Sequence, residues 1–160
     1  MELDISRATV SNYYCVFSKI PNIIYYIQSI DFPSITQNII TYPQPQFSQS
    51  YAAGTHHDVE ELTITALADE TLKNYFSLVY WLRENEKKVH FSETESECSI
   101  VFLNNAKKPI FTTTFHNCIP SMVSSFSLNI QSGDAYTFYF TLRCKDYDIK
   151  YNDGWFPQLN

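Results

Sequence analysis

The sequence has little glycine, little arginine and no long hydrophobic run. Only 3 of its 160 residues are glycine, which excludes collagen-like and glycine-rich disordered chains. No apolar stretch approaches the roughly 18–20 residues that a membrane-spanning helix needs. Arginine occurs only at Arg7, Arg83 and Arg143, and the formal net charge is −6. This balance excludes broad gripping of nucleic acid, which needs clustered cations to neutralise phosphates.

The sequence also lacks closely spaced cysteine pairs. Its 4 cysteines are Cys15, Cys98, Cys118 and Cys144. Structural zinc sites need ligand pairs that are close in sequence, so this spacing does not favour one. The N-terminus contains Glu2 and Asp4 and has no apolar core, unlike a secretory signal. We therefore expect reduced, structural cysteines in a protein assembled in the cytoplasm.

Residues that favour β-structure dominate what the sequence does contain. It has 12 Tyr and 12 Phe, which suit a pleated, half-buried surface, as β-branched residues do. The length predicts one domain over residues 1–160, with an N-terminal arm at 1–10 and a C-terminal extension at 148–160. The segments expected to form strands are residues 11–20, 23–32, 35–41, 58–66, 98–103, 109–118, 122–130 and 135–147.

Turn signals indicate how the first strands are connected. Pro21 and Asn22 separate the first two strands, which we therefore expect to pair as a hairpin. Residues 42–57 are polar and contain Pro43, Pro45 and Gly54, so they are unsuited to a central strand. This segment is interpreted as a projecting loop or an edge hairpin.

One helix is predicted, over residues 69–87. Asp69 is placed to cap the free amides of its first turn. The expected buried stripe consists of Leu72, Tyr75, Phe76, Val79 and Leu82. Trp81 falls on the far side, where it is partly exposed, covered by a neighbouring loop, or in contact with a second surface. Consecutive strands with one helix among them predict a mainly β protein, an antiparallel β-sandwich or barrel with one inserted α-helix.

The residues with catalytic or metal-binding chemistry form no convincing constellation. His56 and His57 are adjacent, so their side chains point apart on an extended chain and chelate poorly. His116 and Cys118 are two residues apart, which puts both on one face of a strand, as a base and its nucleophile require. Nothing nearby supplies the electropositive setting that a reactive thiolate needs. We therefore expect a structural or interaction protein, not an enzyme, with no metal or cofactor.

Several short motifs follow one another in an order known from one protein family. An early strand pair closes in SIDFPS at residues 29–34, and a loop opens at residues 42–43 and ends in YAAG. A VEELTIT strand follows, then a helix opening at Asp69, then CIPS at residues 118–121 before the last hairpin. In this order the chain resembles the tail-tube proteins of contractile-tailed bacteriophages, including tube-like baseplate and tube-initiator proteins.

The resemblance implies a hexameric ring whose inner strands enclose a lumen, with rings stacked into the inner tail tube. The implied partners are further copies of the chain, tail-sheath proteins and baseplate proteins, without a membrane. The implied location is the virion tail, after assembly in the host cytoplasm. DNA is expected to pass through the lumen without specific binding, because binding scales with phosphate contacts.

Candidate residues follow from placing this chain in such a tube. The candidate lumen acids are Asp58, Glu60, Glu61 and Asp134. The candidate contacts between rings or subunits are Tyr42, Phe47, Tyr51, His56, Trp155 and Phe156. Trp81 is the candidate for contact with the sheath or a neighbour.

Three alternatives remain open at the level of the sequence. A tube-initiator or baseplate–tube junction protein shares the expected fold. The inner tube of a phage-derived injection system moves proteins instead of a genome. A carbohydrate-binding β-sandwich module would use Tyr and Trp side chains as stacking platforms.

Overall fold

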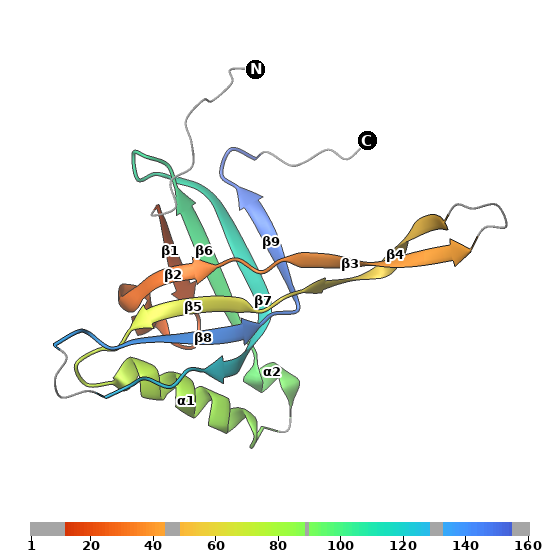
Figure 1. Ribbon diagram of the computed structural model, residues 1–160. Coiled ribbons are helices and arrows are strands. Elements are labelled where there is room, and N and C mark those ends of the chain that lie inside the picture. The colour runs from red at the N-terminus through yellow and green to blue at the C-terminus, as the bar shows by residue number, and fades with distance from the viewer. Residues whose placement is uncertain (1–11, 44–48, 89, 129–132, 155–160) are drawn as a thin grey trace.

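The structure is a computed structural model that describes residues 12–43, 49–88, 90–128 and 133–154. Figure 1 shows a body of strands and helices from which one long hairpin projects. In chain order the elements are β1 (Tyr13–Phe17), η1 (Pro21–Tyr26), β2 (Ile27–Asp31), β3 (Ile35–Pro43), β4 (Gln49–Val59), β5 (Leu62–Leu67), α1 (Lys73–Asn85), α2 (Phe91–Thr94), β6 (Ser96–Leu103), β7 (Pro109–Val123), β8 (Thr137–Arg143) and β9 (Asp146–Tyr151). No helix in these ranges is long and apolar enough to cross a bilayer.

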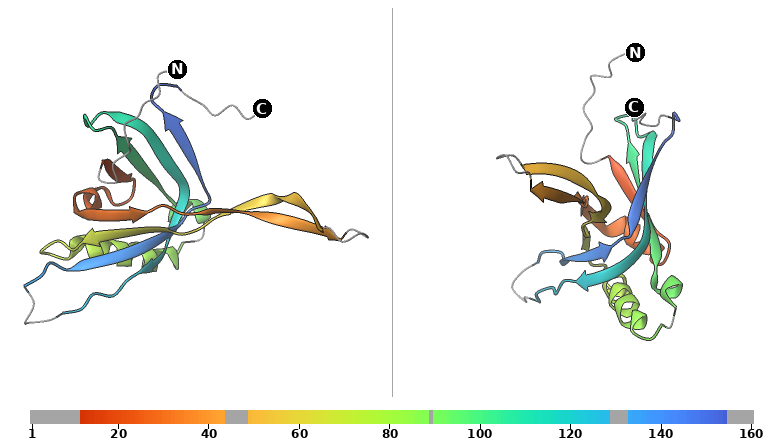
Figure 2. Two further views of the ribbon diagram at one scale, coloured as in Figure 1. Left: turned by 45° about the horizontal axis from the view of Figure 1, so that its top comes forward. Right: turned by 90° about the vertical axis from the view of Figure 1, so that its right-hand side faces the viewer.

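Two antiparallel sheets form the body and share strand β7. Sheet A runs β1-β6-β7-β9, and sheet B runs β7-β8-β5-β2. The first half of β7 pairs with β6 and β9, whereas its second half pairs with β8. Figure 2 shows sheet B crossing sheet A steeply, with α1 below both sheets. Strands β3 and β4 form a separate two-stranded sheet. The predicted mainly β fold with one inserted helix is confirmed.

The hydrophobic core lies between the inner faces of the two sheets. Every second side chain of β5 is buried, including Ile64, and β8 buries Phe138, Phe140 and Leu142 on the same face. Thr141 of β8 is buried as well, on the opposite face. Phe17 of sheet A approaches Phe140 of sheet B with ring centroids 6.0 Å apart. Each large apolar side chain buried here contributes about 1.5–3 kcal/mol relative to exposure. The period-2 pattern of the sequence therefore fixes which face of each strand turns inward.

The predicted pairing of the first two strands is wrong. Strand β1 pairs with β6, and β2 pairs with β5, so the two strands belong to different sheets. Pro21 begins the 3-10 helix η1, because its fixed φ suits the first helical position. Ile23 of η1 is buried in the core. The turn signal was therefore real, but it redirects the chain from one sheet to the other.

Other strand boundaries also differ from the sequence-based expectations. The segments 109–118 and 122–130 were expected as two strands, but β7 runs unbroken through Pro120, where the register with β8 shifts. One strand was expected over residues 135–147, but this range contains all of β8, which ends at Arg143, and the start of β9 at Asp146. Within the segment 42–57, the described residues 42–43 end β3 and residues 49–57 belong to β4, and these two strands pair as a hairpin, as one of the two interpretations proposed.

Helix α1 begins at Lys73, later than predicted, and buries a different stripe. Leu72 is the N-cap residue and has no capping side chain, but Asp69 Oδ1 accepts a hydrogen bond from the first-turn backbone N–H of Lys73 at 2.8 Å, as predicted. The buried residues are Asn74, Leu78 and Trp81, whereas Phe76 is exposed. Asn74 takes a core position because its amide donates to the Leu67 carbonyl at 2.7 Å. The predicted stripe is only half-buried, with Tyr75 packed against the core and Phe76 exposed. Apolar periodicity alone did not anticipate that a hydrogen-bonded polar residue, Asn74, would take the central position.

Candidate assembly surfaces

The hairpin of β3 and β4, here called the arm, exposes apolar side chains along its length. All nine residues of β3 are exposed, and Ile39 and Tyr51 are 62% and 68% exposed. An isolated two-stranded hairpin is marginally stable in water. Figure 1 shows the arm extending well beyond the body. The arm therefore has the character of a surface that another molecule covers.

Both faces of the arm carry apolar groups. The register pairs Thr41 with Tyr51 and Tyr42 with Ser50, so Tyr42 and Tyr51 lie on opposite faces. The predicted contact residues Tyr42, Tyr51 and His56 are all exposed there. Phe47, Trp155 and Phe156, the other predicted contacts, lie outside the described residues.

A close backbone approach shapes the middle of the arm. A Cβ on Gly54 would lie 2.4 Å from the Asn38 carbonyl oxygen, too close for any side chain. The Gln37 side-chain amide donates to the Gly54 carbonyl at 3.2 Å, next to the register shift between Gln37 and Ile39. Gly54 is therefore required where the irregular stretch of β4 crosses β3.

The root of the arm is tied to the body. Phe32 packs on Phe115 and Tyr147, with ring centroids 5.2 and 5.7 Å away. The Glu60 backbone N–H donates to the Ser34 carbonyl at 3.0 Å. His57 Nε2 lies 3.7 Å from Asp146 Oδ1, which joins β4 to the start of β9. These contacts fix the direction in which the arm leaves the body.

Sheet B ends on each side in an edge strand that pairs with only one neighbouring strand of that sheet. Strand β2 pairs with β5, and the second half of β7 pairs with β8; within the described ranges, neither has a ladder partner on its other side. The β7 edge of sheet B exposes Ile119 and Met122. Exposed strand edges with apolar side chains favour pairing with another chain.

The outer face of sheet B, which points away from the core, is rich in hydroxyl groups. On β2, β5 and β8 it consists of Ser29, Asp31, Thr63, Thr65, Leu67, Thr137, Tyr139, Thr141 and Arg143, and on the β7 edge it continues with Ile119 and Met122. Of the threonines, Thr141 is itself buried. Thr63 lies between Asp31 and Thr141 in adjacent strands, and Thr65 lies between Ser29 and Tyr139. This face carries one acid and one base, although the whole chain has a net charge of −6.

The predicted lumen acids do not lie together on that face. Asp58, Glu60 and Glu61 are exposed at the root of the arm, next to the Leu62 end of β5. Asp134 is exposed beyond the opposite end of the β5–β8 ladder, where Leu67 pairs with Thr137. The four carboxylates therefore flank the hydroxyl-rich face at its two ends.

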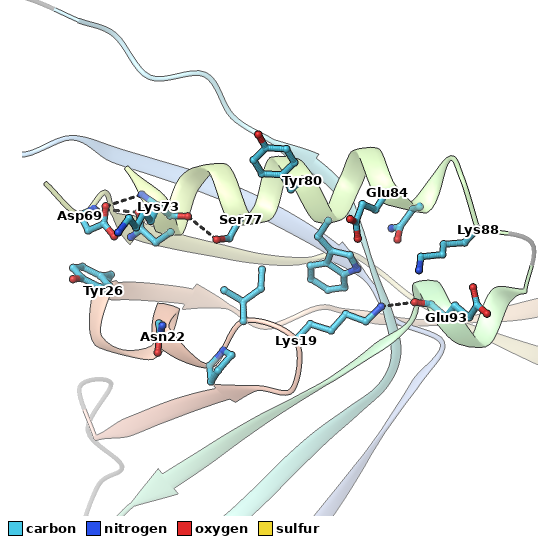
Figure 3. A pocket seen from close by; sticks show the side chains of 15 residues that line it. Lys19, Asn22, Tyr26, Asp69, Lys73, Ser77, Tyr80, Glu84, Lys88 and Glu93 are labelled. Atoms are coloured by element: carbon cyan, nitrogen blue, oxygen red, sulfur yellow. Dashed lines mark hydrogen bonds between the residues drawn. The ribbon is translucent and has the colours of Figure 1, made fainter. Parts of the chain in front are cut away.

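A groove of about 720 Å³ lies between α1 and the segment that joins β1 to β2. Figure 3 shows charged and polar side chains of both elements along it. The Lys19 ammonium donates to the Glu93 carbonyl at 2.6 Å and lies 5.5 Å from the Trp81 ring centroid. Partial burial, with Lys88 nearby, lowers the pKa of Lys19. Lys19 is therefore part of the packing between these elements.

Trp81, predicted as a contact with the sheath or a neighbour, belongs to the wall of this groove and to the core. Its side chain is only 7% exposed, and its indole N–H donates to the Thr94 carbonyl at 3.0 Å. Trp81 lies on the Asn74 face of α1, opposite the predicted stripe, and the segment around α2 covers it, as one of the three alternatives proposed. A buried indole offers little surface to a second protein, so we withdraw Trp81 as a sheath contact.

Comparisons with known proteins agree with this arrangement. No protein-family model matches the chain, and a search of curated proteins finds no significant match. A chain of the anti-feeding prophage baseplate is 18% identical and has a TM-score of 0.70, with 91% of this chain and 97% of that chain covered. A chain of the PVC sheath–tube complex, from an extracellular contractile injection system, is 15% identical with a TM-score of 0.72 and coverages of 92% and 94%. Hcp1 from Flavobacterium johnsoniae is 8% identical with a TM-score of 0.52 and coverages of 86% and 94%.

The chain has the tube-protein fold. Of the proteins that share it, one belongs to a baseplate and another to a sheath–tube complex, which are structural assemblies and not enzymes. At these identities the comparison establishes the fold, and it bears out the resemblance of the sequence to tail-tube proteins.

His116 and Cys118, which the sequence offered as a base and its nucleophile, are not arranged as a catalytic pair in the structure. Asn117 has a φ of 54°, and this left-handed residue interrupts the strand alternation between His116 and Cys118. Cys118 is fully buried, while His116 faces outward with Nε2 2.9 Å from Asp148 Oδ2. The expectation that both lie on one face is wrong, so they do not form a nucleophile and base pair.

The sequence did not single out the hydroxyl-rich face of sheet B. Hydroxyl residues at every second position, Thr63 and Thr65 in one strand and Thr137, Tyr139 and Thr141 in the next, were the available signal. Threonine is also common in strands in general, because its β-branched side chain packs well on a pleated surface. Its presence therefore did not distinguish a solvent-facing surface from ordinary strand composition.

Proposed function

We propose that this chain is a non-enzymatic structural subunit of the inner tube of a contractile, tail-like particle. It forms six-membered rings, and the rings stack into a tube. The observation that carries the proposal is the pair of open edges of sheet B, at β2 and at the second half of β7. The tube-protein fold supports it.

Closure into a ring resolves the open edges. If the β7 edge of one subunit pairs with the β2 edge of the next, every sheet B is continued on both sides and the closed ring of sheet B strands has no open edge. Ile119 and Met122, exposed at the β7 edge, are then covered by the neighbour. A ring of this kind places all copies of sheet B around one central opening.

In this ring the outer face of sheet B lines the lumen. Helix α1 packs on the core side of sheet B, because Tyr75 contacts Phe138 with ring centroids 5.2 Å apart. The lining is then mostly hydroxyl groups, and the predicted lumen acids stand at its two ends. Such a lining offers DNA few cations, so DNA slides through without specific binding. The proposed location is the tail of a virion assembled in the host cytoplasm.

The arm provides the contacts between rings or between neighbouring subunits. Both of its faces carry exposed apolar residues, including Tyr42 and Tyr51, so it suits a position packed between other copies. His56, Phe47, Trp155 and Phe156 remain proposed contacts of the same kind. Sheath and baseplate proteins are the further partners of the assembled tube.

A second candidate is the ring that joins the tube to the baseplate. Its support is the similarity, over 97% of that chain, to a protein of the anti-feeding prophage baseplate. A related candidate is a tube that carries protein cargo, supported by the similarity to an extracellular contractile injection system. Copy number per particle separates tube from junction, because a junction ring needs one set of six subunits. Nucleic-acid and protein analysis of intact particles separates the cargoes.

The test combines electron microscopy with cysteine labelling of sheath-free assemblies. Purified protein at increasing concentration is expected to form six-fold rings or tubes. Single variants Thr137→Cys on the outer face of sheet B and Arg83→Cys on α1 are then labelled with a maleimide polymer too wide for the lumen. The four native cysteines are buried, which keeps the background low.

Assembled Arg83→Cys is expected to react, whereas Thr137→Cys is expected to be protected until the assembly is dissociated. Equal labelling of both variants in the assembly would contradict the placement of sheet B at the lumen. A protein that stays monomeric at high concentration, with both sites reactive, would contradict the ring itself.

A further inference from the structure

The four cysteines form two pairs in the core, and the two pairs differ in geometry. The Cys144 thiol donates to Cys118 Sγ at 2.7 Å. Cys15 Sγ and Cys98 Sγ are 3.4 Å apart. All four thiols are free and buried. A disulfide needs sulfur atoms about 2.05 Å apart and Cβ atoms about 3.5–4.5 Å apart. Whether two cysteines on neighbouring strands lie directly opposite or diagonally therefore decides which pair can form a disulfide.

The strand register places Cys118 directly opposite Cys144. Ile119 pairs with Arg143 on one side of them, and His116 pairs with Asp146 on the other. The same register, continued by one residue from Ile119, aligns Cys118 with Cys144. Directly opposite residues have Cβ atoms about 4.5–5.5 Å apart, the nearest spacing in an antiparallel pair.

The other pair is diagonal. Cys15 lies opposite Ile100, and Cys98 lies opposite Phe17, so Cys15 and Cys98 are two residues out of register. Diagonal neighbours are separated by about 7–8 Å, beyond the usual span of a disulfide. Cys15 and Cys98 therefore provide an internal control in the same core.

Burial keeps the folded thiols unreactive. The hydrogen bond with Cys144, and then burial, raise the pKa of Cys118, so its reactive thiolate is scarce in the folded chain. A bond between these sulfurs is therefore expected to form while the chain folds, before the core closes over them.

We propose that Cys118 and Cys144 are a latent disulfide that forms when the chain folds in an oxidising solution containing a disulfide such as oxidised glutathione. One cysteine, after its thiol loses a proton, attacks oxidised glutathione and releases one reduced glutathione. The sulfur of the other cysteine, having also lost its proton, then displaces the second glutathione. In total the protein loses two hydrogens and one glutathione disulfide is reduced to two thiols.

The bond would clamp the corner of the body. Cys118 lies where β7 passes from sheet A to sheet B, and Cys144 lies between β8 and β9, which belong to different sheets. Joining them fixes the junction of the two sheets covalently. The clamp is independent of ring formation and would act in a single subunit.

The test is oxidative refolding followed by peptide mapping. The full chain is unfolded in reductant and refolded in a mixture of oxidised and reduced glutathione, and remaining thiols are alkylated under denaturing conditions. Peptides containing Cys118 and Cys144 are expected to be linked, with Cys15 and Cys98 alkylated. The linked protein is expected to melt roughly 10 °C higher, and reductant should abolish this shift.

Two variants provide matched controls. Cys144→Ala should lose both the linked peptide and the shift, whereas Cys98→Ala should keep both. Alkylation of all four thiols, or a link between Cys15 and Cys98 instead, would overturn the proposal. Zinc retained by the four thiols in reductant, measured by elemental analysis, would also overturn it. Failure to form rings would leave the mapping result unaffected.

Discussion

The body and the arm of this protein are built from the same kind of strand, yet they are completed in different ways. In the body, side chains such as Leu62, Phe115 and Phe140 are fully buried between two sheets and a helix. In the arm, all nine residues of β3 are exposed, and Ile39 and Tyr51 face solvent. The body therefore carries its own core, whereas the arm depends on a surface supplied by another molecule.

This difference shows where folding ends and assembly begins. Apolar burial within the chain stabilises the body, and its loss should be felt by an isolated subunit. Apolar groups on the arm contribute little until a neighbour removes them from water. Substitutions in the two regions should therefore separate subunit stability from assembly.

The largest effect on the isolated subunit is expected for Phe140→Ala. Phe140 is fully buried and packs against Phe17 across the core, so the substitution should cost about 3–5 kcal/mol of unfolding free energy. Guanidinium denaturation of unassembled protein measures it. Tyr139→Ala, on the outer face of the same strand, is the control and should cost far less. Equal losses would mean that the two faces of β8 are not distinguished as the structure indicates.

A smaller loss is expected for Trp81→Phe. The change removes the indole N–H that donates to the Thr94 carbonyl, at a cost of about 1–2 kcal/mol. Thermal unfolding measures it against Tyr80→Phe, since Tyr80 is exposed on the same helix and should change stability by less than about 0.5 kcal/mol. If Trp81→Phe were as neutral as Tyr80→Phe, its assignment to the core would be wrong.

In the arm, Gly54→Ala should change the local structure more than the overall stability. The new Cβ would meet the Asn38 carbonyl at 2.4 Å, so the backbone of the hairpin must shift. We expect faster hydrogen exchange along β3 and β4, loss of assembly, and a global change below about 1 kcal/mol. Gly133→Ala is the matched control, because a Cβ there has no atom within 4 Å. Normal assembly of Gly54→Ala would show that the irregular stretch is dispensable.

The smallest effect on the isolated subunit is expected for Ile39→Ser combined with Tyr51→Ser. These residues share one face of the arm, and removing exposed apolar groups should change unfolding free energy by less than about 0.5 kcal/mol. Assembly followed by sedimentation should nevertheless fall sharply. Tyr80→Ser on α1 serves as the exposed control and should still assemble. A large loss of stability without assembly would mean that the arm belongs to the subunit's own core.

Local patterns in the sequence predicted much of the body. The alternation of apolar and polar residues in β5 and β8 is visible in the sequence, and its apolar members are the buried ones. Asp69 marked the approach to α1. Of the candidate assembly residues in the 42–57 segment, the described ones, Tyr42, Tyr51 and His56, also proved to be exposed. These features depend on neighbours in the chain, which the sequence displays directly.

Partner choice was predicted less well. Strands β1 and β2 looked like a hairpin but joined different sheets, and Pro120 looked like a break but lies within β7. For Trp81 the sequence left three alternatives open, and only the structure shows that the segment around α2 covers it. Each of these outcomes depends on contacts between distant residues.

By itself, the sequence determined that this protein is built mainly of strands, which side chains alternate into the core and that one segment projects. Only the tertiary structure decided which strands are neighbours, which face of α1 is buried, and that Cys118 meets Cys144. The physical reason is that side-chain alternation follows from the local geometry of an extended chain. Pairing and burial are chosen by the packing of segments far apart in sequence, which local propensity does not encode.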